Sequence, residues 1–146
     1  MTQGTILLVE DNPSDIGLTK RAFAKKSIAN PLIVVQDGQE ALDYLFCEGQ
    51  YADRRTEDRP AVILLDINLP KISGLAVLRR IREDERTALT PVIMLTTSKE
   101  EQDLVTSYRN GANSYIRKPV DFSQFLEAVG QLGMYWLILN ETPQQS

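Results

Sequence analysis

The sequence predicts an α/β protein, a doubly wound (βα)5 sandwich in which five parallel strands form one sheet covered by helices on both faces. Three observations support this fold class. Five short apolar runs recur along the chain, and its 146 residues are the length of a single domain. The runs are continuous rather than alternating, which is typical of strands buried on both faces. The segments between them show helix starts and helical apolar spacing, as parallel strands require.

The predicted strands are aliphatic and rich in β-branched residues. They comprise residues 6–9, 32–35, 62–65 and 92–95, and the brief pair Tyr115-Ile116. Crossovers between parallel strands are right-handed, but strand order does not follow from these runs alone. No run approaches the ~20 apolar residues of a membrane span, so no membrane association is expected.

Each predicted helix begins at a residue that can cap it. The caps are Asn12, followed by Pro13, and then Asp37, Ser73, Ser98 and Asp121. Three of them stand three residues before Glu or Gln and fit the capping-box pattern, namely Asp37 with Glu40, Ser98 with Glu101 and Asp121 with Gln124. Asn110-Gly111 predicts a helix stop. Inward-facing stripes follow at 41, 42, 45 and 46, at 77, 78 and 81, and at 122, 125, 126, 129 and 132.

One connection, residues 48–60, is longer than the usual ~2 to 6 residues and holds seven charged residues. We interpret it as a solvated loop and a candidate partner contact.

Composition excludes several functions. The chain has no histidine, which removes Ser-His-Asp and Cys-His nucleophiles, most zinc sites and self-phosphorylation on histidine. Cys47 is the lone cysteine, and no signal peptide precedes the first strand, so a cytoplasmic protein is expected. The net charge is −4 and the basic residues are scattered, apart from Arg79, Arg80 and Arg82, so nucleic-acid binding is not expected.

Polar residues stand where four of the predicted strands end. They are Glu10 and Asp11, then Asp66 and Asn68, then Thr96, and finally Lys118. The carboxyl ends of parallel strands line the functional crevice of such sheets. Two carboxylates ~4 Å apart repel by ~4 kcal/mol at an effective dielectric of 20, and Mg²⁺ with its oxygen ligands would relieve this. An aspartate beside Mg²⁺, a hydroxyl and a lysine is suited to phosphoryl transfer.

Taken singly, each of these residues has a structural explanation. Strand-end Asp and Asn are common turn residues, Thr96 could be a core β-branched residue, and Lys118 a surface lysine. Their occurrence together, at successive strand ends, favours the functional interpretation.

Four stretches, ILLVEDN, LLDINLPKISG, PVIMLTTS and YIRKPVD, resemble the signatures of bacterial response-regulator receiver domains, from Ile6 to about Leu132. The resemblance implies a flavodoxin-like fold with strand order 2-1-3-4-5 and a receiver domain over residues 1–132. It also implies a two-component phosphorelay protein that takes a phosphoryl group from a sensor histidine kinase and loses it by slow hydrolysis. Such a protein is a signalling switch and not a turnover enzyme.

The same resemblance implies a role for each site residue. Asp66 matches the phosphoacceptor, Thr96 the hydroxyl that turns toward the aspartyl phosphate, Lys118 its counter-charge, and Tyr115 the aromatic that changes rotamer. Glu10, Asp11, Asp66 and the Asn68 backbone carbonyl match the Mg²⁺ ligands, with Mn²⁺ or Ca²⁺ as substitutes. Receivers often have aspartate where this chain has Glu10, a chemically equivalent change. The Lys118-Pro119 bond is expected to be cis.

Residues 133–146 form a predicted extension with six apolar residues, 134–139, and a polar end. Such an apolar stretch predicts either a homodimer contact or a segment folded back on the domain. No output domain is visible, so the output is expected to be a contact with a downstream protein. The long connection and the YWL tail resemble small single-domain receivers paired with phytochrome-type histidine kinases.

Two other functions are considered. A phosphatase of the haloacid-dehalogenase type also uses a strand-end Asp nucleophile, but that family has a second Asp where this chain has Asn68. A pseudo-receiver that only binds partners is opposed by the intact set of Asp11, Asp66, Thr96 and Lys118.

Overall fold

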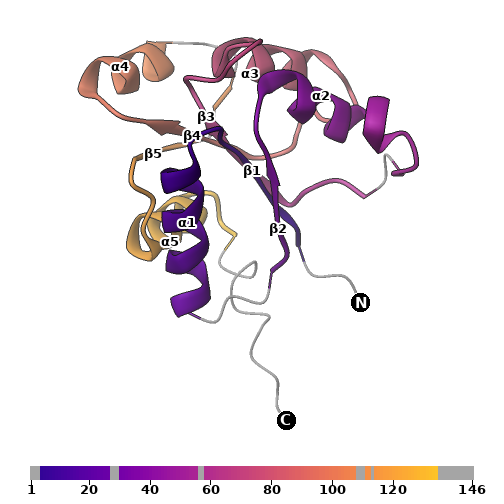
Figure 1. Ribbon diagram of the computed structural model, residues 1–146. Coiled ribbons are helices and arrows are strands. Elements are labelled where there is room, and N and C mark those ends of the chain that lie inside the picture. The colour runs from indigo at the N-terminus through magenta and orange to yellow at the C-terminus, as the bar shows by residue number, and fades with distance from the viewer. Residues whose placement is uncertain (1–3, 27–29, 56–57, 108–110, 113, 135–146) are drawn as a thin grey trace.

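The computed structural model describes residues 4–26, 30–55, 58–107, 111–112 and 114–134 (Figure 1). Strands and helices alternate along them. The strands are β1 (Ile6–Val9), β2 (Leu32–Val35), β3 (Val62–Asp66), β4 (Val92–Thr96) and β5 (Ser114–Arg117). The helices are α1 (Pro13–Lys25), α2 (Gly38–Phe46), α3 (Gly74–Glu83), α4 (Lys99–Ser107) and α5 (Phe122–Gln131), with a 3₁₀ turn η1 (Gly49–Tyr51) after α2.

The five strands form one parallel sheet in the order β2-β1-β3-β4-β5, which confirms the predicted fold class and strand order. In the register, Ile6 of β1 lies beside Leu32 of β2 on one side and Val62 of β3 on the other. β3 and β4 each extend one residue beyond the predicted runs, to Asp66 and Thr96. These two predicted site residues therefore belong to the sheet itself.

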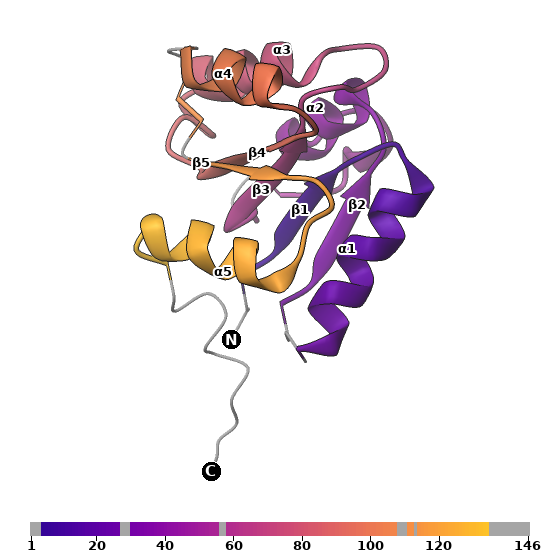
Figure 2. The ribbon, with the colours of Figure 1, turned by 90° about the vertical axis from the view of Figure 1, so that its left-hand side faces the viewer.

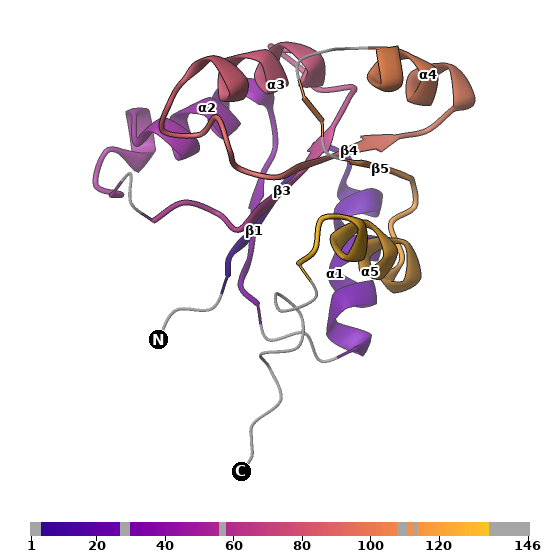
Figure 3. The ribbon, with the colours of Figure 1, turned by 180° about the vertical axis from the view of Figure 1, so that it is seen from behind.

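Helices cover both faces of the sheet, with α1 and α5 on one side and α2, α3 and α4 on the other (Figures 2 and 3). Alternate residues of each strand enter different cores. Leu7 and Val9 pack with α2 and α3, while Ile6 and Leu8 pack with α1 and α5. Every strand residue of β1, β3 and β4 is buried, which explains why these runs are continuous rather than alternating.

All five predicted cap residues accept a hydrogen bond at a helix start, but the capping box forms only at α5 among the described helices. At α2 the Glu40 carboxylate accepts from the backbone N–H of Gln36, one residue before the cap. At α4 Glu101 likewise accepts from the N–H of Thr97. The two other boxes were thus wrongly predicted, because these glutamates bind the residue before the cap instead.

The connection after α2 is more ordered than the sequence predicts. Tyr51 donates a 2.6 Å hydrogen bond to Glu40, and its ring meets that of Tyr44 edge-on at 5.1 Å between centroids. The Arg54 guanidinium lies 3.7 Å from the centroid of the Tyr44 ring and donates to the Tyr44 carbonyl. Most described residues of the connection are exposed, as predicted for a solvated loop, but Tyr51 and Arg54 fasten it to α2.

Two predictions fall partly outside the described residues. The first is the predicted helix stop Asn110-Gly111, of which Asn110 lies outside the described residues and Gly111 has a positive φ of 88°. The second is the predicted apolar extension, most of which lies outside the described residues. Its first apolar residue, Met134, is described and is buried in the core beside α5. Of the helices in the described ranges, none has the length and apolar character needed to span a membrane.

Candidate functional site

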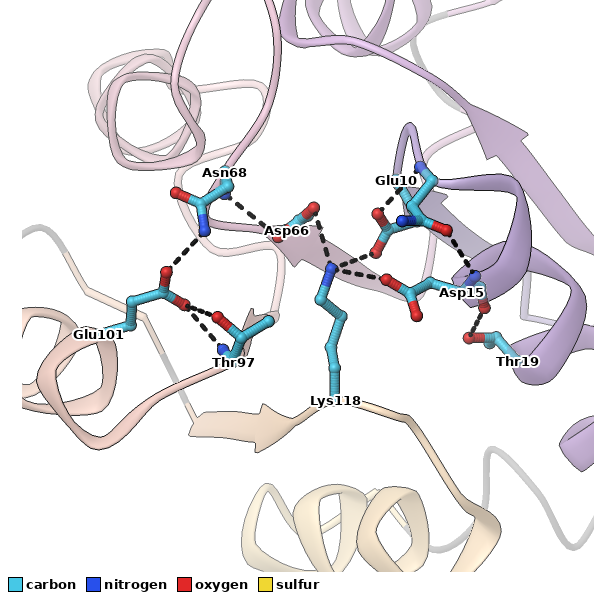
Figure 4. A network of polar contacts seen from close by, with 9 residues as sticks. Glu10, Asp15, Thr19, Asp66, Asn68, Thr97, Glu101 and Lys118 are labelled. Atoms are coloured by element: carbon cyan, nitrogen blue, oxygen red, sulfur yellow. Dashed lines mark hydrogen bonds and ion pairs between the residues drawn. The ribbon is translucent and has the colours of Figure 1, made fainter.

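The carboxyl ends of β1, β3 and β5 bring an acid, an aspartate and a lysine together (Figure 4). Glu10 follows β1, Asp66 is the last residue of β3, and Lys118 follows β5. The backbone N–H of Lys118 donates to the Thr96 carbonyl at 2.7 Å, which ties the start of the β5–α5 connection to the end of β4. The Lys118-Pro119 bond is cis, as predicted.

The backbone around Asp66 is packed so closely that α3 must begin with glycine. A Cβ atom on Gly74 would lie 2.1 Å from the Asp66 carbonyl oxygen. The backbone N–H of Gly74 donates to the Ile67 carbonyl at 3.1 Å, and that of Asn68 donates to Oδ1 of Asp66, also at 3.1 Å. Asp66 is thus held at one position and is only 2% exposed.

Three carboxylates form a cluster that fits a hard divalent cation. One oxygen each of Glu10, Asp11 and Asp66 lies within 4.8 Å of the others. Glu10 and Asp66 are buried, whereas Asp11 is exposed and leaves the cluster open on one side. Oxygen-only donors of this kind suit Mg²⁺, Mn²⁺ or Ca²⁺ rather than a softer metal. Asp11 and Asp66 therefore lie together, as the sequence predicts.

Lys118 supplies the positive charge of the site. Its Nζ donates to Asp15 at 3.0 Å, to Glu10 at 3.1 Å and to Asp66 at 3.3 Å. Burial by itself lowers the pKa of Lys118, but the three carboxylates outweigh it and hold that pKa above its usual range. Lys118 therefore stays charged, and it is the ion-pair partner of the buried Asp66.

Glu10 is held less securely as an anion. Burial, followed by repulsion from Asp66, raises its pKa from 4.5 to about 7, although Lys118 acts in the opposite direction. The same residue accepts from the backbone N–H of Asn12 at 3.2 Å. The cluster therefore carries more negative charge than one lysine neutralises, as expected of a site completed by a cation.

In the metal-free protein, the contribution of Glu10 to the free energy of unfolding is expected to fall as the pH rises from 4.5 to about 7. Folded Glu10 holds its proton more tightly than the unfolded chain does, so the folded state loses stability as that proton leaves. The expected loss is roughly 2–3 kcal/mol. Urea denaturation in EDTA at acid and neutral pH measures it. Glu10→Gln cannot titrate, so an unchanged pH dependence in that variant would contradict the assignment.

The two predicted switch residues, Thr96 and Tyr115, differ in burial. Thr96 is fully buried at the end of β4, and its hydroxyl has no hydrogen-bond partner in the described part of the chain. Leaving a buried hydroxyl unpaired costs ~1–3 kcal/mol, so an acceptor placed within its reach would gain that bond. Tyr115, on β5, is 43% exposed, so its ring is not enclosed in the core.

Two acids of the site were missed by sequence reasoning. Asp15 lies in the first turn of α1 and binds Lys118. Glu101 of α4 accepts from the Thr97 N–H at 2.7 Å and from the Asn68 side chain at 2.6 Å (Figure 4). Both read as ordinary helix-start acids, since acidic residues are favoured there by the helix dipole. Only their partners mark them as part of the site.

This combination of a buried aspartate, an acidic cluster and a lysine at the strand ends of a 2-1-3-4-5 sheet defines a protein of the receiver class. Comparison with known proteins agrees. The sequence profile of the response regulator receiver domain matches residues 6–130. The chain belongs to this family, and is a phosphoacceptor signalling protein of two-component systems. Membership favours the receiver interpretation over the phosphatase alternative.

Two relatives illustrate the similarity in sequence. The probable methanogenesis regulatory protein FilR2 of Methanothrix harundinacea is 38% identical over 94% of this chain and 86% of its own length. Response regulator Rcp1 of Synechocystis sp. is 36% identical over 90% of this chain and 88% of its own length.

Solved structures are similar over nearly the whole chain. The bacteriophytochrome response regulator AtBRR shares 48% identity with a TM-score of 0.89, over 96% of this chain and 99% of its own. The Mn²⁺-bound form of Rcp1 shares 33% identity with a TM-score of 0.73, over 98% and 99%. The phosphorylated cyanobacterial phytochrome response regulator RcpA shares 36% identity with a TM-score of 0.72, over 99% and 100%.

Proposed function

We propose that Asp66 accepts the phosphoryl group of this response regulator from the phosphohistidine of a sensor histidine kinase. The observation that carries the proposal is the contact of Asp66 with both Lys118 and the acidic cluster, at a strand end where its carboxylate is buried but the cluster is open at Asp11. One Asp66 oxygen forms the bond to phosphorus as the bond from phosphorus to the histidine nitrogen breaks. Hydrolysis of the acyl phosphate returns the carboxylate.

Glu10, Asp11, Asp66 and the Asn68 backbone carbonyl would hold a divalent cation, which we propose to be Mg²⁺. When bound, the cation neutralises charge on the phosphoryl oxygens during transfer. The fit rests on the three carboxylates within 4.8 Å of one another and on the bound Mn²⁺ of the similar protein Rcp1. Mn²⁺ or Ca²⁺ are proposed as substitutes, because they also accept oxygen ligands.

Lys118 and Thr96 would respond to the new group. A phosphoryl group adds roughly −1.5 to −2 charges and three strong acceptors. Lys118 already contacts Asp66 and would contact a phosphoryl oxygen, and the unpartnered Thr96 hydroxyl would donate to another. Movement of Thr96 at the end of β4 would alter the packing against the neighbouring strand β5. Tyr115 on β5 would then change rotamer. The result would be an altered α4–β5–α5 surface.

The partners follow from the similar proteins. Because AtBRR and RcpA are phytochrome response regulators, we propose that a phytochrome-type histidine kinase donates the phosphoryl group. We propose that the signal then passes by contact to a downstream protein. We also propose that residues 1–132 are the receiver domain and that, in the extension 133–146, the apolar residues after the buried Met134 contribute to a homodimer contact. A cytoplasmic location remains a prediction from the lone cysteine.

Removing divalent cations is expected to stop phosphoryl uptake by the wild-type protein. With a small acyl phosphate and Mg²⁺, intact-mass analysis should show one added phosphoryl group per chain, and EDTA should reduce this to background. Without a cation, the anionic donor would meet a cluster whose carboxylates repel it. Restoring excess Mg²⁺ should restore uptake. Equal uptake with and without EDTA would overturn the proposed cation requirement.

A further inference from the structure

Of the three acids that contact Lys118 in the described part of the chain, Asp15 is the one that lies outside the acidic cluster of Glu10, Asp11 and Asp66. It is also the most exposed of the lysine's three partners, with 24% of its side chain accessible against 1% for Glu10 and 2% for Asp66. Its 3.0 Å contact is nevertheless the shortest of the three. Asp15 therefore accepts one hydrogen bond of the Lys118 ammonium group, as Glu10 and Asp66 do, without belonging to the acidic cluster.

Helix α1 fixes Asp15 in this place. The backbone N–H of Asp15 donates to the Asn12 side chain at 3.1 Å. The carbonyl of Asp15 accepts from the buried Thr19 hydroxyl at 2.9 Å (Figure 4). These bonds hold the first turn of α1, so the carboxylate reaches Lys118 from a rigid element rather than from a loop. Within the described part of the chain, the carboxylate of Asp15 forms its ion pair with Lys118.

The hydrogen-bonding capacity of Lys118 is fully used at rest. An ammonium group has three N–H donors, and each contacts one carboxylate. A phosphoryl oxygen on Asp66 would be a fourth acceptor for three donors. A bound cation would share the charge of Glu10 and Asp66 but not that of Asp15, so Asp15 is the acid that continues to draw the lysine away.

We propose that Asp15 is a positioning residue, which holds the Lys118 ammonium toward α1 and thereby limits how strongly Lys118 pairs with a phosphoryl group on Asp66. The inference rests on the proposed function for its second half, the pairing with the phosphoryl group. Its first half, the hold on Lys118, concerns the resting protein alone. Asp15 touches neither the reacting oxygen nor the phosphorus, and acts through Lys118.

The test uses Asp15→Asn, which keeps the size of the side chain and removes its charge. At saturating Mg²⁺, the variant is expected to bind beryllofluoride roughly 3- to 10-fold more tightly than the wild type, because one negative charge is gone and the lysine is released. In the metal-free protein, the ¹⁵N resonance of the Lys118 Nζ should shift. A purely structural role at the helix start would lower thermal stability without producing either change.

Asp84→Asn is the matched control. It makes the same chemical change at the far end of α3, where Asp84 pairs with Arg86 at 2.7 Å, and should alter neither the beryllofluoride affinity nor the Lys118 resonance. Asp15→Ser, which also removes the carboxylate, should reproduce the tighter binding and keeps the test valid should Asp15→Asn fold poorly.

Unchanged or weaker beryllofluoride binding by the folded Asp15 variants, or an unshifted Lys118 resonance, would overturn the inference. Failure of the proposed function would look different, because the wild type would then bind no beryllofluoride at all. In that case the limit on phosphoryl pairing would fall with the proposed function, while the resonance would still report whether Asp15 holds Lys118.

Discussion

Replacing Asp66 with Asn is expected to abolish phosphoryl uptake completely. The amide has no anionic oxygen to attack phosphorus, yet it preserves the shape of the side chain and can still accept from the Asn68 N–H. The substitution also removes the repulsion that Asp66 exerts on Glu10, so the fold should be no less stable than the wild type in EDTA. Loss of uptake would therefore reflect the missing nucleophile rather than unfolding.

Intact-mass analysis after incubation with a small acyl phosphate and Mg²⁺ measures this result, and urea denaturation checks the fold. Asp121→Asn is the matched control, because Asp121 caps α5 and asparagine is an equally good cap. That variant should take up phosphoryl groups like the wild type. One phosphoryl group per chain on Asp66→Asn would place the acceptor at another residue, which peptide mapping would identify.

The second large effect is expected from Lys118→Met, which keeps the aliphatic length and removes the charge. The metal-free protein should lose about 3–5 kcal/mol of unfolding free energy at neutral pH, because three carboxylates would be left without their common partner. Only 10% of the Lys118 side chain is exposed, so water cannot replace that partner well. Phosphoryl uptake should also fall sharply, since the fixed counter-charge is gone.

The stability loss of Lys118→Met should be smaller at acid pH. Lys118 lowers the pKa of Glu10, so in its absence that pKa rises above about 7 and Glu10 takes up a proton below it. Urea denaturation in EDTA at pH values on either side of this range provides the measurement. Lys71→Met is the control, because Lys71 pairs with Asp37 on the surface and should contribute no more than ~1 kcal/mol. Equal losses in the two variants would refute the central role of Lys118.

The predicted elements agree with the structure where their signals are local. The strand cores at 6–9 and 32–35 match β1 and β2 residue for residue, and each cap residue accepts a bond at its helix start. Buried runs and caps depend on neighbours a few residues away, which a sequence displays directly. The capping boxes at α2 and α4 failed because a glutamate at the third helical position can bind the residue before the cap equally well.

Side chains that meet across elements are harder to predict. Arg54 and Tyr51 fasten the connection after α2 through the Tyr44 ring, although their sequence is that of a charged loop. Glu101 reaches Asn68 across 33 residues. Neither contact has a sequence signal, because charged and aromatic residues in loops and first turns are ordinarily solvated or structural.

The sequence by itself determined the fold class, the order of elements and the acids, hydroxyl and lysine at the strand ends. It could do so because burial and capping are patterns along one segment, and because parallel strands place their carboxyl ends at one edge. Only the tertiary structure decided which groups share the Lys118 ammonium, and that Asp15 is one of them across 103 residues. That choice depends on the rotation and distance of α1 against β3 and β5, which arise from packing of the whole core.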